Sequence, residues 1–342
     1  MSEYVRNISE RLVKKHDVTV FASNPEGTLP RYEVINGVKV FRYNCFAPSG
    51  AYYFSAELPA MLRKEKFDVV HAHNYHGLPF HIAGLFARCD KFIVSPCFHG
   101  AGHTTFRDCL FKIFKPFGKR TLKRADHILA ASEFEKSLLC RFFDFRPDDI
   151  VVIPRGVDFS EFKGLKRKRH HSKSILFVGR LVEYKGVQFL VEALPKLPKD
   201  VILKIVGKGP LRSRLEARAK HLGVYDRIRF YQNLERKELL QMYADSDVFV
   251  LPSRYEAYSK VVAEALMAGI PCIVANTSAL KEWVDNESCF GIDYPINVRE
   301  LAELIDAVMQ KLVDKEITHK WVGIKIIDWN NVVCRLEKIY RM

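Results

Sequence analysis

The sequence predicts an α/β protein made of two Rossmann-like, doubly wound domains, one after the other along the chain. Short β-branched runs alternate with longer stretches that have the apolar spacing of amphipathic helices. This alternation stops at a polar, basic stretch and then begins again. The length of 342 residues, with 48% apolar and 27% charged residues, suits two hydrophobic cores in a globular protein. A ligand cleft is expected between the domains, at the carboxyl ends of both sheets.

The first domain is predicted over residues 1–155 and begins with the amphipathic helix pattern MSEYVRNISERL. This helix leads directly into a strand, without the buried strand and glycine-rich turn that normally open such a domain. We therefore expect a gap in the first sheet, which a neighbouring segment fills unless the chain is a shortened version of a longer protein. The strands of this domain are predicted over residues 18–23, 38–43, 69–73, 91–98, 127–132 and 150–156, with helices over 56–66 and 132–143.

The basic stretch of residues 156–172 has no clear periodicity, and we interpret it as the linker between the domains. The second domain is predicted over residues 173–327. Its strands are predicted over residues 174–179, 201–207, 227–233, 248–253 and 272–276.

Composition limits the compartment and the kind of site. No apolar segment approaches the ~18 residues needed to span a bilayer, and the opening residues lack the apolar centre of a secretory signal, so we expect a cytoplasmic protein. The eight cysteines have no spacing typical of metal ligands. We expect them to be reduced and mostly buried, and we expect no metal site.

The charge balance indicates an anionic partner. The chain has 54 Lys and Arg against 40 Asp and Glu, a formal net charge of +14, and such a charge suits nucleic acid, a phosphorylated metabolite or an acidic membrane face. Residues 111–124, FKIFKPFGKRTLKR, interleave aromatic and basic residues at roughly helical spacing. Two interpretations stay open: a helix that docks peripherally on the inner face of an anionic membrane, and a solvated helix that packs on its own domain.

The stretch SRYEAYSKVVAEAL, residues 253–266, places Glu256 and Glu264 eight positions apart. A strand pattern ends just before it, so Glu256 is predicted in a loop, and Ser259 has the residue type of a helix N-cap. Glu264 then lies about one and a half turns into the following helix. This loop and helix N-terminus are expected at the carboxyl edge of a parallel sheet, where backbone N–H groups favour anionic ligands.

Earlier loops of the second domain suit a phosphorylated ligand as well. One predicted strand ends at Gly179 and is followed by Arg180 and, just before a helix, by Lys185. Two cations beside a helix N-terminus suit a diphosphate. After the next strand, Gly207 and Gly209 would let the backbone come close to a base or ribose. Each of these features is weak by itself, because loop cations and glycines are usually only solvated or structural.

In this order, the motifs resemble those of a known family. FVGRLVEYKG, IVGKGPLRSRLE and EAYSKVVAE followed by ALMAGIPCIVAN are similar to the donor half of the retaining, GT-B-fold glycosyltransferases of family 4. FHG, ADHILAASEFEKSLL and VIPRGVDFSEF match the same family, so the resemblance covers nearly the whole chain. It implies a GT-B fold, two Rossmann-like domains facing a central cleft, with a C-terminal helix at about 328–342 that crosses back to the first domain.

The resemblance also implies roles for particular residues. Glu256 would contact the donor sugar, Glu264 would hydrogen-bond the nucleotide ribose, and Arg180 and Lys185 would stabilise the leaving diphosphate without a metal or other cofactor. His99 would lie against the donor sugar near the anomeric carbon. The backbone around the following residues would meet sugar or phosphate oxygens: Tyr258, Ser259 and Lys260. His71, His73 and His76 end another predicted strand, and two interpretations stay open for them: structural histidines, or residues that line the acceptor side.

The function this implies is retaining transfer of a hexose from a UDP- or GDP-sugar to a hydroxyl group of a glycan or lipid-linked acceptor. The sequence departs from the family pattern at Ala257 and Ser259, where glycine or proline is common, and in lacking the N-terminal Gly-Gly loop. The alternative is a nucleotide-sugar-binding protein or subunit that is inactive because that loop is missing. An isomerase of the same fold is disfavoured, and no nucleic-acid partner is expected, because neither explains the ordered motifs.

Overall fold

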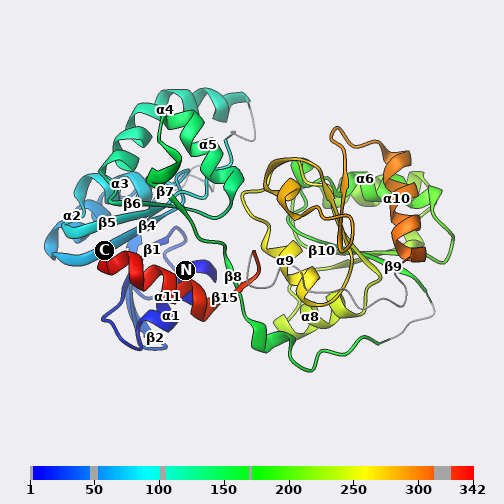
Figure 1. The fold of residues 1–342 in the computed structure, drawn as a ribbon, viewed down its shortest axis with the longest axis horizontal. Helices are drawn as coiled ribbons and strands as arrows, with labels where there is room; N and C mark the ends of the chain where they lie inside the picture. Colours follow the sequence, from blue (N-terminus) through cyan, green and yellow to red (C-terminus); the bar gives the residue numbers. More distant parts are fainter. Residues whose placement is uncertain (1–2, 47–52, 101–104, 169–171, 312–324) are drawn as a thin grey trace. The chain divides into compact units, whose positions relative to one another are not determined.

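The computed structural model describes residues 3–46, 53–100, 105–168, 172–311 and 325–342 (Figure 1). The chain divides into two compact units. Unit 1 comprises Met1–Gly156 and Ile327–Met342, and unit 2 comprises Val157–Ile326. The C-terminal helix α11 (Trp329–Arg341) therefore belongs to the unit that contains the N-terminus, as the family resemblance implies.

Unit 1 is an α/β unit with helices on both faces of a parallel sheet. Its strands are β1 (Thr19–Asn24), β2 (Tyr32–Ile35), β3 (Val38–Asn44), β4 (Phe67–His73), β5 (Cys89–Ser95), β6 (His127–Ala130) and β7 (Ile150–Val152). Besides α11, its helices are α1 (Glu3–Leu12), α2 (Glu57–Lys64), α3 (Leu78–Phe86), α4 (Thr105–Arg124) and α5 (Glu133–Phe143). The sequence patterns predict all of these strands except β2, a short strand with exposed positions that pairs antiparallel with β3.

The strands of unit 1 form two sheets. One has the order β1-β3-β2 and the other is the parallel sheet β4-β5-β6-β7. The two sheets come close where the ring of Phe21 on β1 meets the ring of Phe67 on β4, with centroids 6.0 Å apart. Among the described residues no ladder joins β1 to β4, so the gap expected in the first sheet lies between these two strands.

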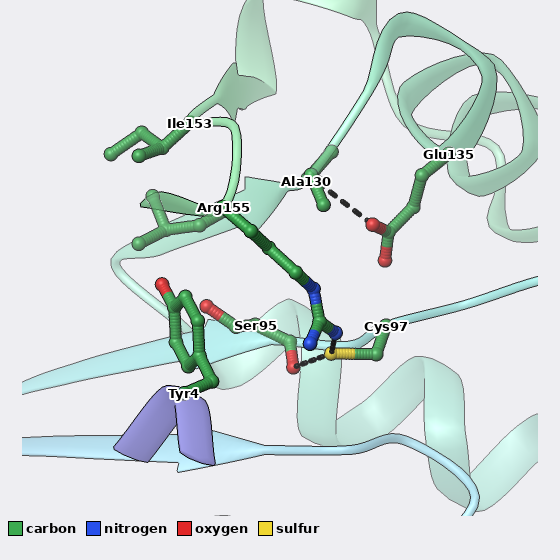
Figure 2. Close-up of a pocket in the computed structure, with 9 residues that line it drawn as sticks. Tyr4, Ser95, Cys97, Ala130, Glu135, Ile153 and Arg155 are labelled. Atoms are coloured by element: carbon green, nitrogen blue, oxygen red, sulfur yellow. Dashed lines mark hydrogen bonds between the residues drawn. The ribbon is translucent and has the colours of Figure 1, made fainter. Parts of the chain in front are cut away.

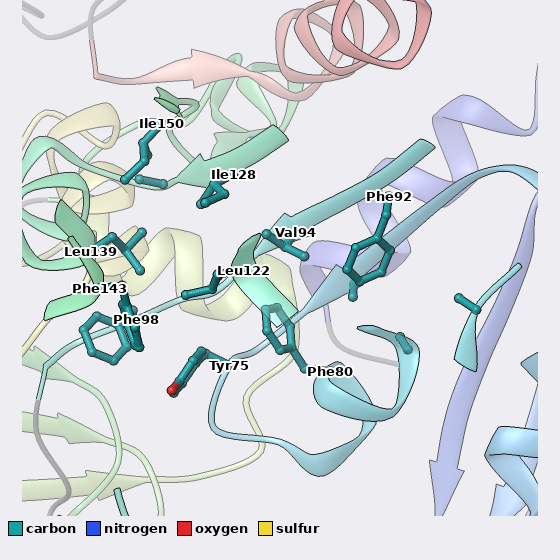
Figure 3. Packing of buried hydrophobic residues seen from close by; sticks show 14 of the residues in the cluster. Tyr75, Phe80, Phe92, Val94, Phe98, Leu122, Ile128, Leu139, Phe143 and Ile150 are labelled. Carbon is teal, nitrogen blue, oxygen red and sulfur yellow. The ribbon is translucent and has the colours of Figure 1, made fainter. Parts of the chain in front are cut away.

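Alternate residues of the parallel sheet of unit 1 pack into different cores. Phe92 and Val94 face the core formed with α2, α3, α4 and α5, whereas Ile93 between them faces α1 and α11. Figure 3 shows the first core, in which Phe98 and Phe143 pack together. Helix α11 lies beside α1 because its apolar residues recur every three or four positions and cover the second face (Figure 1).

Unit 2 is a doubly wound domain with one six-stranded sheet. Its strands are β9 (Ser174–Val178), β10 (Ile202–Val206), β11 (Ile228–Tyr231), β12 (Val248–Leu251), β13 (Cys272–Ala275) and β14 (Cys289–Ile292). Its helices are α6 (Val187–Ala193), α7 (Arg212–His221), α8 (Arg236–Ala244), α9 (Lys260–Met267) and α10 (Val298–Lys311). Short 3-10 helices include η2 (Phe159–Phe162), η3 (Glu183–Lys185) and η6 (Ser278–Trp283).

The strand order of unit 2 reverses its direction of winding at one point in the sheet. All ladders are parallel, in the order β11-β10-β9-β12-β13-β14, so the winding direction reverses between β9 and β12. In open parallel sheets, ligands bind outside the carboxyl ends of the strands at this reversal. The sequence patterns predict every strand of this sheet except β14.

The chain passes between the units at β8 (Gly156–Val157) and β15 (Ile327–Asp328), which pair with each other. A Cβ atom on Gly156 would lie only 2.4 Å from the Trp329 ring, so a glycine is needed there. Part of the basic stretch predicted as a linker is attached to unit 2. Arg167 forms an ion pair with Asp247, and the Lys168 N–H donates to the Asp245 carboxylate at 2.7 Å.

Candidate functional site

The loops that follow β9 and β12 meet at the reversal point of unit 2. The Ser253 hydroxyl donates to the Tyr184 carbonyl at 3.2 Å, and the Arg254 N–H donates to the same oxygen at 2.7 Å. Gly186 has φ 76°, and a Cβ there would lie 2.2 Å from the Pro252 carbonyl oxygen. A glycine at this position therefore lets the two loops touch, which brings Lys185 and Glu256 into one place.

Lys185 and Glu256 form an ion pair between Nζ and Oε1. Their side chains are only 15% and 12% exposed, so water screens this pair less than a surface pair. Glu256 is fixed from its backbone too, since its N–H donates to the Ser278 hydroxyl at 3.1 Å. The sequence predicts both residues in the site but does not predict that they are partners.

Arg180 lies beside this pair but is exposed to solvent. Its guanidinium donates to the Tyr184 hydroxyl and lies over the Tyr184 ring, 5.7 Å from the centroid. The Lys185 ammonium is also 5.7 Å from that centroid. Tyr184 therefore holds both predicted diphosphate cations near the same ring, a positioning role that the sequence analysis missed.

The glycines of the neighbouring loops have a packing reason for being glycine. A Cβ on Gly207 would lie 1.9 Å from the Gly179 carbonyl oxygen, and one on Gly209 would lie 2.3 Å from the Leu181 carbonyl oxygen. The backbone also joins the loops, since the Leu181 N–H donates to the Lys208 carbonyl at 2.8 Å. These contacts stabilise the loop that carries Arg180, whether or not a nucleotide approaches the glycines.

Ser259 precedes α9, as the sequence predicts, but it does not cap the helix with its side chain. Its backbone is left-handed, with φ 75° and ψ 79°, and its hydroxyl makes no cap hydrogen bond. The buried Oγ has no hydrogen-bond partner among the described residues. Ala257, the other departure from the family pattern, is not among the residues with positive φ. The conformation that favours glycine is therefore required at Ser259 and not at Ala257.

Tyr258 is a core residue and only 4% exposed. Its hydroxyl donates to the Lys325 carbonyl at 2.7 Å, and its ring packs edge-on against Trp283. The Trp283 indole N–H donates to the Tyr258 carbonyl at 2.8 Å. Tyr258 thus anchors the loop that presents Glu256 and Ser259.

Glu264 is buried in a charged cluster and is 3% exposed. Its Oε1 lies 2.8 Å from Arg236 Nη1 and 3.1 Å from Lys260 Nζ, and the Tyr243 hydroxyl donates to its Oε2 at 3.4 Å. Arg236 also donates to Glu161 at 2.7 and 2.9 Å. Sequence reasoning missed Arg236, because nothing in the order of residues connects α8 with α9 and η2.

Four histidines of unit 1 lie at or just after the carboxyl ends of β4 and β5: His71, His73, His76 and His99. The ring of His99 stacks on that of His76, with centroids 4.4 Å apart. His71 is hydrogen-bonded to the Tyr340 hydroxyl and the Ser95 hydroxyl, both at 2.8 Å. Burial lowers the pKa of His71 well below its usual value, and burial followed by the charge of Arg155 lowers the pKa of His73 to about 3. His71 and His73 are therefore neutral at pH 7.

The described residues contain no cluster of His, Cys, Asp or Glu that would hold a metal ion. The cysteines that the structure describes are free thiols, but among them only Cys272 and Cys289 are buried and Cys334 is exposed, so the expectation that they are mostly buried is wrong. No described helix is both long and apolar enough to cross a membrane.

In the basic aromatic stretch, Phe117 is 60% exposed, whereas Arg124 donates to carbonyls at the end of α3. The side chains of residues 111–114 lie outside the described residues.

Each half of the chain matches a known protein family. Residues 1–161 match the model of Glycosyltransferase Family 4, and residues 158–321 match that of Glycosyl transferases group 1. The chain is 30% identical, over 82% of its length and 76% of the relative, to an Escherichia coli UDP-Gal:alpha-D-GlcNAc-diphosphoundecaprenol alpha-1,3-galactosyltransferase.

Solved structures share the fold at lower identity. Sucrose-phosphate synthase from Thermosynechococcus elongatus has a TM-score of 0.83 at 19% identity, covering 99% of this chain and 92% of that one. Alr3699/HepE of Anabaena, solved in complex with UDP and glucose, has a TM-score of 0.77 at 16% identity, covering 99% and 95% of the two chains. The fold, the ordered motifs and the match over both halves together show that this chain belongs to the GT-B glycosyltransferases of family 4.

Proposed function

We propose that this glycosyltransferase moves a hexose from a nucleoside diphosphate sugar to a hydroxyl acceptor, with retention of anomeric configuration. The observation that carries the proposal is the convergence of Lys185, Glu256 and Ser259 at the reversal point of the unit 2 sheet. A cation, a carboxylate and a buried hydroxyl that has no partner in the described part of the chain, all beside a helix N-terminus, suit the two ends of a sugar diphosphate.

The diphosphate is proposed to lie at the N-terminus of α9. The Ser259 Oγ is buried without a partner among the described residues, and such a group is costly unless a ligand or water satisfies it. The first N–H groups of α9 and the helix dipole favour an anion at the same place. Lys185 and Arg180 would neutralise the charge that develops as the nucleotide leaves, and for that step no metal is required in this proposal.

Glu256 is proposed to act on the donor sugar. When a diphosphate binds, Lys185 gains an anionic partner and its ion pair with Glu256 loosens, which makes the carboxylate available to sugar hydroxyls. The acceptor hydroxyl then attacks the anomeric carbon from the face that the diphosphate leaves, so the bond from this carbon to the diphosphate oxygen breaks and that oxygen takes the proton of the acceptor. Glu256 stabilises charge and orients the sugar in this scheme, and His99 in unit 1 is proposed as a further sugar contact.

Glu264 is proposed to bind the nucleotide ribose, but only after a local change. Its carboxylate is 3% exposed and already has Arg236 and Lys260 within ion-pair distance. In this proposal a ribose hydroxyl donates to the carboxylate when Lys260, its ion-pair partner in the first turn of α9, gives way. Gly179, Gly207 and Gly209 complete the proposed nucleotide side by holding the adjacent loops together.

The acceptor is proposed to be a glycan or a lipid-linked saccharide. The Escherichia coli relative acts, by its name, on a diphosphoundecaprenol-linked sugar, and Anabaena HepE was solved with UDP and glucose. A lipid-linked acceptor agrees with the exposed Phe117 beside basic residues on α4, which we propose as a peripheral contact with an anionic membrane from the cytoplasmic side.

Incubation with a panel of UDP- and GDP-sugars, followed by mass spectrometry of nucleotide and products, tests the function. We expect one donor to release its nucleotide, with transfer to a lipid-linked or glycan acceptor and an α-linked product from an α-configured donor. A β-linked product would disprove retention. Thermal stabilisation by a nucleotide sugar without any release would favour the alternative, a binding protein or subunit. The proposal would be overturned if no donor of the panel released its nucleotide and none stabilised the protein.

A further inference from the structure

Unit 1 has a small pocket beside Arg155, and the groups that line it satisfy one another. The pocket has room for about one water molecule and is lined mainly by apolar surface. Figure 2 shows the Arg155 side chain pointing between Cys97 and Glu135, and the buried Glu135 carboxylate is its charge partner. In the described part of unit 1, a surface without such a partner lies at β2, on the edge of the β1-β3-β2 sheet (Figure 1).

The β2 edge is an exposed apolar surface. Among the described residues, eleven large apolar side chains are exposed, and five of them lie within residues 29–54. Two of these five belong to β2, where Tyr32 is 50% and Val34 is 56% exposed. Because residues two apart in a strand point to the same face, these two side chains share one face. Single exposed apolar residues are common, but their concentration in one segment indicates an interaction surface.

The backbone of β2 offers hydrogen-bonding groups beside these side chains. Among the described residues β2 pairs with β3 alone, and the pairing is antiparallel. The Arg42 N–H donates to the Arg31 carbonyl at 2.7 Å, so these two arginines form a hydrogen-bonded pair of the ladder. Hydrogen-bonded and non-hydrogen-bonded pairs alternate along an antiparallel ladder, so Tyr32 and Val34 belong to the second kind. Their N–H and C=O groups therefore point away from β3, out of the sheet edge.

The β2 edge is locally neutral, although the chain has a formal net charge of +14. Residues 29–44 contain three cations, and each of them has a carboxylate partner. Because these charges are already paired, the edge gives no advantage to an anionic partner and does not repel an identical edge. The ion pairs are Arg31 with Glu57 at 2.5 Å, Lys39 with Asp17 at 2.7 Å, and Arg42 with Glu33.

We propose that β2 is the docking edge for a second copy of this chain, with the two β2 strands antiparallel about a two-fold axis. When the axis passes beside Glu33, Tyr32 lies opposite Val34 of the second copy, and the reverse pair follows by symmetry. The members of each pair exchange both N–H···O bonds, because these are the residues whose backbone groups point outward.

Side chains support the same register. Tyr32 and Val34 of the two copies meet on one face as cross-strand apolar pairs. The Tyr32 ring already packs on Phe41, with centroids 4.7 Å apart, so ordering it on docking costs little. The two Glu33 carboxylates face each other across the axis, but each is ion-paired with the buried Arg42 of its own copy. The two-fold pairing therefore brings no uncompensated like charges together.

Sedimentation equilibrium of the full chain tests the proposal, at concentrations from about 1 to about 300 µM. A reductant is present because Cys334 is exposed and could otherwise link two copies. We expect a reversible monomer–dimer equilibrium with a Kd on the order of 10 µM, because one short strand edge is smaller than a standard interface. A chain that stays monomeric throughout would overturn the proposal and leave this edge to a different partner.

Variants connect the dimer to β2. Val34→Lys places a charge on the edge and should weaken dimerisation at least about tenfold. The control Val151→Lys makes the same change at an exposed position of β7, the edge strand of the other sheet of unit 1, and should dimerise as the wild type does. Equal affinity in wild type and Val34→Lys, or an equal loss in both variants, would contradict the assignment.

Hydrogen exchange of the wild type keeps the test decisive if Val34→Lys does not fold. Raising the concentration from about 1 to about 300 µM should slow amide exchange in the peptide that contains Tyr32 and Val34. Exchange in the peptide that contains β7 should stay the same, since β7 is also an edge strand but is not in the proposed interface. A dimer that forms without slower exchange at β2 has its interface elsewhere, which would exclude β2 as the docking edge.

Discussion

The Lys185 ammonium is ion-paired with the Glu256 carboxylate, although 71 positions separate the two residues in the sequence. Both side chains are largely buried, and each is the partner that offsets the desolvation of the other. A diphosphate that enters beside them changes this balance, because it offers Lys185 a second anion. The pair thus connects the diphosphate end of the proposed donor site with its sugar end.

Replacing Lys185 tests this connection. Lys185→Gln should lower turnover about 100-fold or more, because one preorganised positive donor for the leaving group is lost and Glu256 is left unpaired. Steady-state rates with the best donor measure it. Lys199→Gln, at an exposed lysine before β10, is the matched control. Equal loss in both variants would indicate a general charge effect and not a specific site.

Substitutions at Ser259 separate backbone strain from ligand contact. Ser259→Gly should raise the free energy of unfolding by about 1 kcal/mol, because φ 75° costs nothing for glycine and the unpartnered Oγ is removed. Ser259→Ala keeps the strain and removes only the hydroxyl. Both variants should bind the nucleotide sugar more weakly than the wild type. Denaturant unfolding of the two variants measures the change in stability, and titration with the donor measures the change in affinity. If both variants bind the donor as tightly as the wild type, the Ser259 Oγ does not contact the phosphate.

Removing Arg236 should destabilise unit 2. Arg236→Gln leaves the 3%-exposed Glu264 with Lys260 as its remaining ion-pair partner, at a cost of about 2 kcal/mol in the free energy of unfolding. Glu161→Gln removes a more exposed partner of the same arginine and should cost less than 1 kcal/mol. Urea unfolding measures both. A larger loss in Glu161→Gln than in Arg236→Gln would contradict this account of the cluster.

His73 should make the protein sensitive to acid. The pKa of His73 is about 3 in the folded protein, against 6.5 for an ordinary histidine. Below pH 6.5 the histidine is therefore protonated in the unfolded chain while it stays neutral in the folded protein. Its contribution to stability is complete above pH 6.5 and falls by about 1.4 kcal/mol per pH unit as the pH drops towards 3.

Unfolding at pH 7.5 and at pH 5.5 checks this contribution. The wild type should lose about 1.4 kcal/mol more than His73→Gln between these values. His221→Gln, at an exposed position of α7, controls for the loss of a histidine. An identical pH dependence in wild type and His73→Gln would show that the buried imidazole does not control this range.

Flotation with liposomes tests the membrane contact proposed for α4. The wild type should float with vesicles that contain acidic lipid and not with neutral ones, and the triple change of Lys115, Lys119 and Arg120 to glutamine should reduce flotation. Arg124 is left unchanged because it donates to carbonyls at the end of α3. The control is a triple change of Lys196, Lys199 and Lys237 to glutamine, which removes the same three positive charges at exposed positions of unit 2. Equal reduction by both triple changes would exclude α4 as the contact.

Much of the fold could be predicted from the sequence. β-branched runs between helix patterns predict β9 to β13 and, in unit 1, β1 and β3 to β7, because buried parallel strands have continuous apolar runs. Among the missed strands, β2 is an edge strand with exposed positions, β14 includes Gly291, and β15 has two residues. None has the pattern of a central strand, and each is held by pairing with a neighbour.

The sequence by itself determined the family, the order of elements and the residue types of the donor site, because these depend on local periodicity and on motifs of adjacent residues. Only the tertiary structure decided that Lys185 is paired with Glu256, that Arg236 reaches Glu264 and that Ser259 is left-handed. The physical reason is that burial and ion pairing depend on which loops the winding of the sheet brings together, and residues far apart in the chain leave no local pattern of that meeting.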